Sequence, residues 1–295
     1  MVLHRNLGPF DTTAIGLGEM PLTIENNLGP KMGVETIHAA LDAGCRQIDT
    51  AWAYYCSGGE EQTGEKLVRE ALASWDGPRD EVLVATKVGH FRNFTDGKPT
   101  WDVDGSPENL IKRAKQSAFE LGVDMIDLLY FHRPDPKIPY GESCEAMKEI
   151  RSMGIAREIG ISNASIEQID IAREILGDSL IAVQNQFSPS HPDPEHTMEH
   201  CAELGLAFVC WSPLGGFLDA FDQRAYDPFR TVAGNHGCSY QRVVLAWELS
   251  RYERLFTIPS ARNPQEINDS FAATELMLTQ DELAMLNASV DARRG

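Results

Sequence analysis

Basic residues are scarce in this sequence. Its 295 residues include 26 lysines and arginines against 44 aspartates and glutamates, which gives a formal net charge of −18 at pH 7, and no basic run occurs. Nucleic acids and anionic membrane surfaces are both bound through clustered lysines and arginines. Neither is therefore expected as a partner, and any anionic ligand must find a local positive site.

Long hydrophobic stretches and paired cysteines are also missing. No stretch approaches the roughly 20 apolar residues that span a bilayer. The opening MVLHRNLGPF lacks the charged-then-apolar pattern of a secretory signal. The six cysteines are scattered without a C-x-x-C pair, so reduced thiols are expected. Together these absences predict a cytoplasmic protein.

Short apolar runs alternate with longer stretches of helical periodicity along the whole chain. The expected strands are residues 13–17, 46–49, 82–87, 126–132, 156–162, 180–186, 207–211 and 255–259. The expected helices are 34–43, 60–72, 141–152, 195–204, 239–250 and 279–290, with three more that begin after caps at Ser106, Ser165 and Asn263. This alternation implies a parallel sheet, and eight units favour a closed (β/α)8 TIM barrel of the α/β class over an open sheet. No linker divides the chain, so residues 1–295 are expected to form a single domain.

Two segments between expected elements are unusually long. Residues 89–105 and 212–238 both follow a strand, and we interpret both as loops. In a barrel they would lie on the C-terminal face, where the active site is built.

Several motifs of common enzyme classes are absent or incomplete. The sequence has no G-x-x-x-x-G-K-[ST] phosphate loop, no G-x-S-x-G nucleophile turn and no Tyr-x-x-x-Lys pair. Gly16-x-Gly18 follows the first expected strand, but Pro21 stands where the third glycine of a dinucleotide fold belongs. A Rossmann-type cofactor domain is therefore not expected.

One short motif suggests zinc. His196-Thr-Met-Glu199-His200 matches an inverted zinc-protease pattern, in which two histidines hold the metal and the glutamate acts as base. The segment is expected on an outer helix, away from the strand ends. A surface histidine pair is the preferred interpretation, so no metal site is expected, and a zinc hydrolase stays an alternative.

Polar residues stand at the ends of successive expected strands. Asp49, Lys87 and His132 would converge on one barrel mouth, and Tyr54 follows Asp49 by five residues. A neighbouring ammonium stabilises a phenolate, so we expect Lys87 to lower the pKa of Tyr54, with Asp49 as counter-charge. His132 can orient the same substrate oxygen. The set fits donation of a proton to a carbonyl oxygen as a hydride reaches the carbon.

Seven motifs in order carry a resemblance to a known family. They are Asp49-Thr-Ala-Trp-Ala-Tyr54, Thr86-Lys-Val88, Leu128-Leu-Tyr-Phe-His132, Gly160-Ile-Ser-Asn163, Val183-Gln-Asn185, Trp211-Ser-Pro-Leu-Gly215 and Ile258-Pro-Ser-Ala-Arg-Asn-Pro264. Over nearly its whole length the sequence resembles the aldo-keto reductase superfamily. The resemblance implies an enzyme that interconverts small carbonyl compounds (aldehydes, ketones or sugars) and alcohols. It also implies Tyr54 as general acid, with Asp49, Lys87 and His132 completing a tetrad.

The resemblance also implies a nicotinamide cofactor extended over the barrel mouth. It assigns the carboxamide to Ser162, Asn163 and Gln184, the ring to Trp211, the pyrophosphate to the backbone at Ser212 and Leu214, the 2′-phosphate to Ser260 and Arg262, and adenine to Asp269. A flat indole suits stacking, and a helix N-terminus favours phosphate. NADPH is preferred. Glu266 and Ser270 depart from the family pattern and leave NADH open.

The run His132-Arg-Pro-Asp-Pro136 is similar to the branch of channel-associated β subunits and bacterial reductases of broad substrate range. Arg133 replaces an aromatic substrate wall, and the chain ends soon after its last expected helix, so an open, polar pocket is expected. The residues expected to line it are Trp52, Trp101, Arg133 and Phe217.

A cofactor-binding regulatory protein with little turnover remains the alternative to an enzyme. The sequence leaves open the substrate, the direction of reaction and whether the protein is a monomer or a homo-oligomer.

Overall fold

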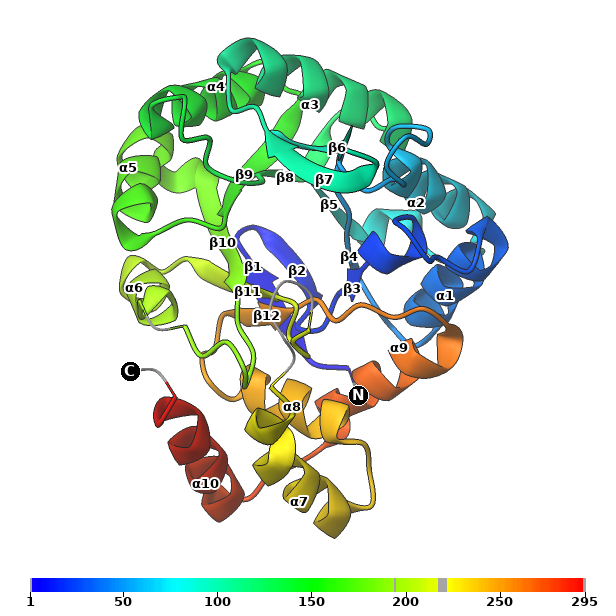
Figure 1. The fold of residues 1–295 in the computed structure, drawn as a ribbon, viewed down its shortest axis with the longest axis vertical. Coiled ribbons are helices and arrows are strands. Elements are labelled where there is room, and N and C mark those ends of the chain that lie inside the picture. Colours follow the sequence, from blue (N-terminus) through cyan, green and yellow to red (C-terminus); the bar gives the residue numbers. More distant parts are fainter. Residues whose placement is uncertain (1, 194, 217–221, 294–295) are drawn as a thin grey trace.

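The computed structural model describes residues 2–193, 195–216 and 222–293, and its centre is a parallel sheet (Figure 1). The 8-stranded sheet has the order β12-β11-β10-β9-β8-β5-β4-β3. The strands are β3 (Leu17–Gly18), β4 (Gln47–Asp49), β5 (Leu83–Val88), β8 (Ile126–Phe131), β9 (Ala156–Ser162), β10 (Leu180–Gln186), β11 (Ala207–Trp211) and β12 (Leu255–Thr257). Parallel bridges from Ile15 to Thr257 and from Gly18 to Ser260 join the two outer strands. The sheet therefore closes into a barrel, as predicted.

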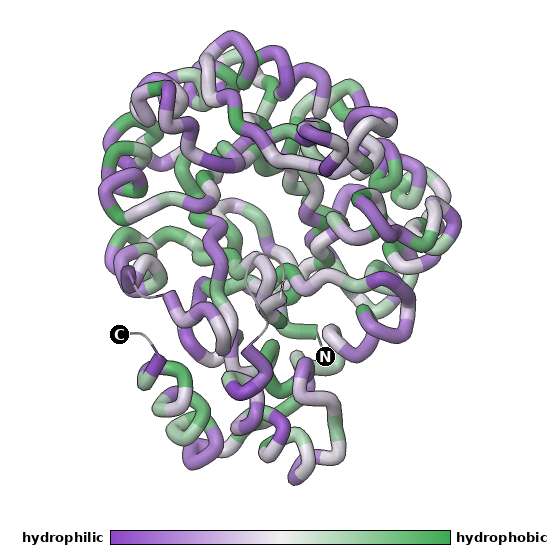
Figure 2. The backbone as a smooth tube through the Cα atoms, in the orientation of Figure 1, coloured by the Kyte–Doolittle hydropathy of each residue, from purple (hydrophilic) through white to green (hydrophobic). Residues whose placement is uncertain are grey.

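Helices surround this barrel. They are α1 (Pro30–Asp42), α2 (Thr63–Ser74), α3 (Pro107–Leu121), α4 (Tyr140–Ser152), α5 (Ile166–Leu176), α6 (Thr197–Leu204), α7 (Asp227–His236), α8 (Tyr240–Leu249), α9 (Pro264–Phe271) and α10 (Gln280–Asp291). Hydrophobic and hydrophilic residues alternate along the outer helices (Figure 2). In α3, for example, Leu110, Ala114, Ser117 and Leu121 are buried at helical spacing, whereas Phe119 is 75% exposed. No helix within the described residues is long and apolar enough to cross a membrane.

Side chains that the sequence marks as caps begin several of these helices. Ser165 with Gln168, and Thr279 with Glu282, form reciprocal capping boxes, and Asn263 accepts the backbone N–H of Glu266. Ser106 stands at the N-cap of α3, but its hydroxyl donates to Asp104 at 2.6 Å and does not cap the helix.

The interpretation of residues 89–105 and 212–238 as loops is wrong in part. The first segment forms an antiparallel hairpin of β6 (His90–Thr95) and β7 (Lys98–Val103). Asp96 and Gly97 make its turn at φ 50° and 74°, the left-handed pair that a two-residue hairpin turn requires. The second segment contains a 3-10 turn, Gln223–Tyr226, and the whole of α7.

A second hairpin, which the sequence analysis missed, closes the N-terminal end of the barrel. It consists of β1 (His4–Leu7) and β2 (Phe10–Thr13) and lies across the centre of the ring in Figure 1. Leu7 is fully buried and packs with residues at the starts of the strands, including Leu83, Ile181 and Ala207. Gly8 has φ 57°, and a Cβ there would come within 2.8 Å of Ile181. With this end closed, only the carboxyl ends of the strands can form an open site.

Candidate active site

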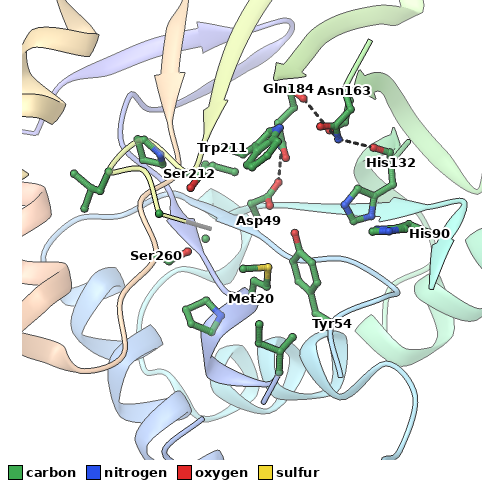
Figure 3. Close-up of a pocket in the computed structure, with 18 of the residues that line it drawn as sticks. Met20, Asp49, Tyr54, His90, His132, Asn163, Gln184, Trp211, Ser212 and Ser260 are labelled. Atoms are coloured by element: carbon green, nitrogen blue, oxygen red, sulfur yellow. Dashed lines mark hydrogen bonds between the residues drawn. The ribbon is translucent and has the colours of Figure 1, made fainter. Parts of the chain in front are cut away.

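A cavity of about 580 Å³ opens at the carboxyl ends of the strands (Figure 3). Its walls come from the segments that follow β3, β4, β8, β9, β11 and β12, and from the β6–β7 hairpin. The polar and aromatic residues that line it include Asp49, Tyr54, His90, Trp101, His132, Arg133, Ser162, Asn163, Gln184, Trp211, Ser212, Ser260, Arg262 and Glu266.

Lys87 links the residues at the base of this cavity. Along β5, side chains point alternately outward and inward. Thr86 therefore bonds Glu65 of α2 at 2.6 Å, and Lys87 enters the barrel with only 1% of its surface exposed. Its ammonium group donates to the Asp49 carboxylate, to the backbone carbonyl of Thr50 at 2.8 Å and to the Tyr54 hydroxyl at 3.2 Å. Lys87 thus lies behind Tyr54 and outside the cavity wall.

Two further side chains fix the geometry around Tyr54. The amide of Gln184 donates to the second carboxylate oxygen of Asp49 at 2.8 Å. The ring of His132 stands nearly perpendicular to that of Tyr54, with centroids 6.0 Å apart. Figure 3 shows the Tyr54 hydroxyl pointing into the space between Asp49 and His132. The structure thus brings the four predicted catalytic residues together.

The protonation states follow from burial and charge. Burial raises the pKa of Tyr54, and the opposing effect of Lys87 does not cancel this, so the phenol pKa lies above its ordinary value. Lys87 does lower the pKa of Tyr54, as expected, but the larger effect of burial outweighs it. Burial alone would lower the pKa of Lys87, but Asp49 and Tyr54 raise it above the ordinary value. Burial and nearby cationic groups hold the pKa of His132 well below its usual range. At neutral pH the site contains a phenol, an ammonium and a neutral imidazole.

The residues assigned to the cofactor line one side of the same cavity. These are Ser162, Asn163, Gln184, Trp211, Ser212, Leu214, Ser260 and Arg262. Asn163 takes φ 58°, and its amide donates to the His132 carbonyl at 2.9 Å and to the Ser162 hydroxyl at 2.9 Å. The segment after β9 is thereby tied to His132, which directly follows β8.

The segment after β11 has the chemistry to accept a phosphate group. Ser212, Gly215 and Gly216 have φ of 50°, 74° and 86° and line the cavity, and such left-handed positions allow backbone N–H groups to form an anion-binding concavity. Across the cavity, the Arg262 guanidinium is exposed and has no ion pair within the described ranges. Glu266 lines the cavity near it, with its carboxylate on the backbone N–H of Arg262 and on the side chain of Asn263. These donors fit a dinucleotide, although Glu266 sets one negative charge beside the proposed phosphate.

Two predicted site residues, Trp52 and Asp269, do not reach the cavity. The backbone N–H of Trp52 continues the pairing along β5, and its buried indole packs under the guanidinium of Arg113 at 3.5 Å. Asp269 forms an ion pair with Arg242 and accepts the hydroxyl of Ser239, so its carboxylate is engaged away from the wall. Phe217 lies outside the described residues.

The sequence analysis missed His90, which forms part of the wall. The ring stacks on Trp101 at 4.9 Å and meets His132 edge-on at 4.7 Å. Burial, together with the charge of Arg133, lowers the pKa of His90 to about 3. Its position just after the end of β5 was the available signal, since strand ends carry the site in a barrel.

The candidate zinc motif is engaged in other contacts. His200 contacts Asp170 at 2.7 Å, and His196 is the N-cap residue of α6, close to Glu199. Among the residues that the structure describes, no group of three metal-binding side chains could hold an ion. The six cysteines are all free thiols, as predicted.

The molecule is thus a (β/α)8 barrel with a tyrosine, a lysine, an aspartate and a histidine at the carboxyl ends of its strands. The profile of the Aldo/keto reductase family matches residues 14–291, so the chain belongs to this family of oxidoreductases.

Individual relatives agree with this assignment. An uncharacterized oxidoreductase of Schizosaccharomyces pombe is 30% identical over 100% of this chain and 90% of its own length. Pyridoxine 4-dehydrogenase of Escherichia coli is 28% identical over 95% of this chain and 96% of its own length. The crystal structure of a Bombyx mori aldo-keto reductase in complex with NADP matches with a TM-score of 0.77 at 24% identity, covering 98% of this chain and 93% of that one.

Proposed function

We propose that this enzyme interconverts small carbonyl compounds and alcohols with NADPH as the preferred cofactor, and that Tyr54 donates the proton to the carbonyl oxygen. The contact of Lys87 with both Asp49 and the Tyr54 hydroxyl carries the proposal. Elsewhere in a protein a buried lysine is costly unless it is paired. Here its ammonium is held against a phenol that faces the cavity.

Each of the four residues has a distinct part. Tyr54 holds a proton at its hydroxyl, and the ammonium of Lys87 stabilises the phenolate as that proton leaves. Asp49 keeps Lys87 charged, and Gln184 in turn holds Asp49. Neutral His132 orients the substrate oxygen and does not add a positive charge.

Cofactor placement is the second part of the proposal. When bound, the nicotinamide supplies the hydride. Ser162, Asn163 and Gln184 would hold its carboxamide, Trp211 its ring, and the backbone from Ser212 to Gly216 its pyrophosphate. Ser260 and Arg262 would hold the 2′-phosphate, which favours NADPH over NADH.

Two coarser features are also proposed. The barrel draws strands from the first 20 residues and from beyond residue 250, which supports one domain over residues 1–295. The run His132 to Pro136 supports kinship with the channel β-subunit-like branch, and within it Asp135 accepts the backbone N–H of Gly105 at 3.0 Å.

The test compares two neighbouring phenols. Tyr54→Phe should lower kcat for a reactive aromatic aldehyde by about 10²- to 10⁴-fold, the usual contribution of a general acid. Its Kd for NADPH, measured by quenching of tryptophan fluorescence, should stay within about twofold. Tyr55→Phe is the matched control, because Tyr55 bonds the backbone of Arg92 and does not line the cavity.

Equal losses in both variants would contradict the role of Tyr54. Cofactor binding with no turnover across aldehydes, ketones and keto-sugars would favour the regulatory alternative.

A further inference from the structure

Arg133 is a cation at the cavity wall without an anionic partner. It follows His132 directly, is half-buried, and its guanidinium carbon lies 5.8 Å from the centre of the Trp211 ring. Within residues 2–193, 195–216 and 222–293 its side chain makes no hydrogen bond and no ion pair. In a chain of net charge −18, such a cation facing a cavity calls for an explanation.

The acidic side chains that line the same cavity are already engaged. Asp49 is held by Lys87 and Gln184. Glu25 pairs with Arg92 and accepts the backbone N–H of Ser57 at 2.8 Å. The carboxylate of Glu266 accepts the backbone N–H of Arg262 at 2.9 Å and the side-chain amide of Asn263 at 2.8 Å. None of these carboxylates neutralises Arg133.

The partial burial of the Arg133 guanidinium makes its lack of an anionic partner unfavourable. Burial lowers the pKa of Arg133, because the charged guanidinium has lost part of its hydration. Burial first, and the charge of Arg133 in addition, lower the pKa of His90 and His132. Arg133 directly follows His132, whose ring faces that of Tyr54. A ligand anion at this place would offset the lost hydration.

We propose that Arg133 binds the carboxylate of a substrate that carries a carbonyl group and an acid group in one small molecule. The inference rests on the proposed function, because it places the carbonyl at Tyr54 and His132 and the acid beside it at Arg133. One cation matches one negative charge, which favours a carboxylate over a doubly charged phosphate. A guanidinium also presents paired N–H groups that fit the two carboxylate oxygens.

The test uses matched substrates that differ only in charge. For 4-formylbenzoate and 4-formylbenzamide, the readout is the ratio of their kcat/KM values, which cancels any general loss of activity. Arg133→Gln should lower the acid-to-amide ratio by about 10- to 100-fold, the effect of losing a charge-assisted hydrogen bond. The acid-to-amide ratio of Arg133→Lys should lie between that of the unaltered protein and that of Arg133→Gln, because lysine keeps the charge but loses the paired N–H groups.

A control variant removes the same charge elsewhere. This control is Arg157→Gln. Arg157 lies at the start of β9, away from the cavity, with its guanidinium carbon 5.7 Å from the centre of the Phe10 ring. Its acid-to-amide ratio should equal that of the unaltered protein. If it falls as far as that of Arg133→Gln, the effect is one of overall charge and the proposal is wrong.

Other outcomes also decide. An unchanged ratio in Arg133→Gln with a raised KM for NADPH would make Arg133 a cofactor contact. The ratio of kcat/KM for glyceraldehyde 3-phosphate to that for glyceraldehyde can be measured in the same variant. If Arg133→Gln lowers this ratio more than it lowers the acid-to-amide ratio, the site binds phosphate.

If no substrate is turned over, the proposed function fails, and calorimetry with benzoate and benzamide tests the site directly. Binding of benzoate that is lost in Arg133→Gln would support the acid site on its own. Equal binding of benzoate by both proteins would overturn it.

Discussion

Glu19 is a fully buried carboxyl group close to Lys87 and Asp49, two of the proposed catalytic residues. It lies between β3 and the 3-10 turn at Met20–Leu22, and its oxygens accept the hydroxyls of Thr23 at 2.5 Å and Thr50 at 2.8 Å. The Thr50 carbonyl accepts the ammonium of Lys87. A Cβ at Gly64 would come within 2.5 Å of a Glu19 oxygen, so only glycine leaves room for this carboxyl group.

This group should make stability depend on pH. Burial raises the pKa of Glu19 from 4.5 to about 7, so the folded protein binds this proton more tightly than the unfolded chain does. Its stabilising contribution is complete below about pH 4.5 and is lost as the pH rises through about 7. The loss is about 3 kcal/mol of unfolding free energy, at about 1.36 kcal/mol per pKa unit.

The measurement is urea denaturation of the unaltered protein and of Glu19→Gln between pH 4.5 and 8. The variant should gain stability relative to the unaltered protein by about 3 kcal/mol across this range. The contributions of other buried acids cancel in this difference of unfolding free energies. Glu35→Gln, at an exposed position on α1, should show no pH-dependent difference. A difference that does not change with pH would contradict a raised pKa at Glu19.

Among the secondary-structure elements, capped helices and buried strands could be predicted from the sequence, but the hairpins were missed. The capping boxes at Ser165 and Thr279 are local patterns, readable from side chains three residues apart. The β6–β7 hairpin has a local signal as well, Asp96-Gly97, which was overlooked inside a polar segment. The only buried positions of β6 and β7, His90 and Arg92, are polar, so no hydrophobic pattern marked these segments as strands.

The sequence predicts which residues lie at the strand ends, but it does not predict where each side chain points. Asp49, Tyr54, Lys87 and His132 follow from strand ends and one spacing, because a barrel brings all such ends to one mouth. Trp52 lies on the same segment as Tyr54, but its backbone pairing with Lys87 points the indole outward to α3. Glu19 and His90 each contact at least one residue from a distant part of the chain, Thr50 and His132 respectively.

The start of α9 is the element that should select the cofactor. Arg262 carries the free guanidinium beside the cavity, whereas Glu266 in the first turn adds a negative charge. Arg262→Ala should therefore raise KM for NADPH by about 10-fold or more, since a charge-assisted contact to phosphate is worth about 1.5–3 kcal/mol. KM for NADH should change by less than about twofold, because NADH lacks the 2′-phosphate.

Steady-state kinetics with both cofactors measures this selectivity. Glu266→Gln is the companion variant, and it should improve NADPH more than NADH by removing the nearby charge. If Arg262→Ala affects both cofactors equally, the 2′-phosphate assignment is wrong.

At the scale of the whole molecule, the excess of negative charge is offset at the cavity by a few cations. Arg133 and Arg262 line the cavity, and Lys87 lies behind Tyr54, which its ammonium contacts. A field of net charge −18 repels anions, so an acidic substrate and a dinucleotide both need such cations close to the site. We therefore expect binding of both to depend on these residues more strongly than on the overall charge.

The closed N-terminal end of the barrel should contribute mainly to stability, whereas the open C-terminal end holds the candidate active site. Leu7, on the β1–β2 hairpin, is fully buried among side chains of β5, β10, β11 and β12 at the end opposite the cavity. Leu7→Ala should lower the free energy of unfolding by about 2–5 kcal/mol, the usual effect of truncating a buried leucine. Among the described residues, only Trp211 and Ile258 belong both to the cavity wall and to the hydrophobic cluster around Leu7, so kcat per folded molecule should stay within about twofold.

Leu3→Ala is the matched control for this last prediction. Leu3 precedes the same hairpin and is 37% exposed, so its truncation should cost less than about 1 kcal/mol. Denaturant unfolding measures both variants, and the active fraction is counted by NADPH binding before kcat is compared. A large fall in kcat of folded Leu7→Ala would show that the closed end transmits strain to the mouth, whereas equal stability of the two variants would show that the hairpin does not support the barrel.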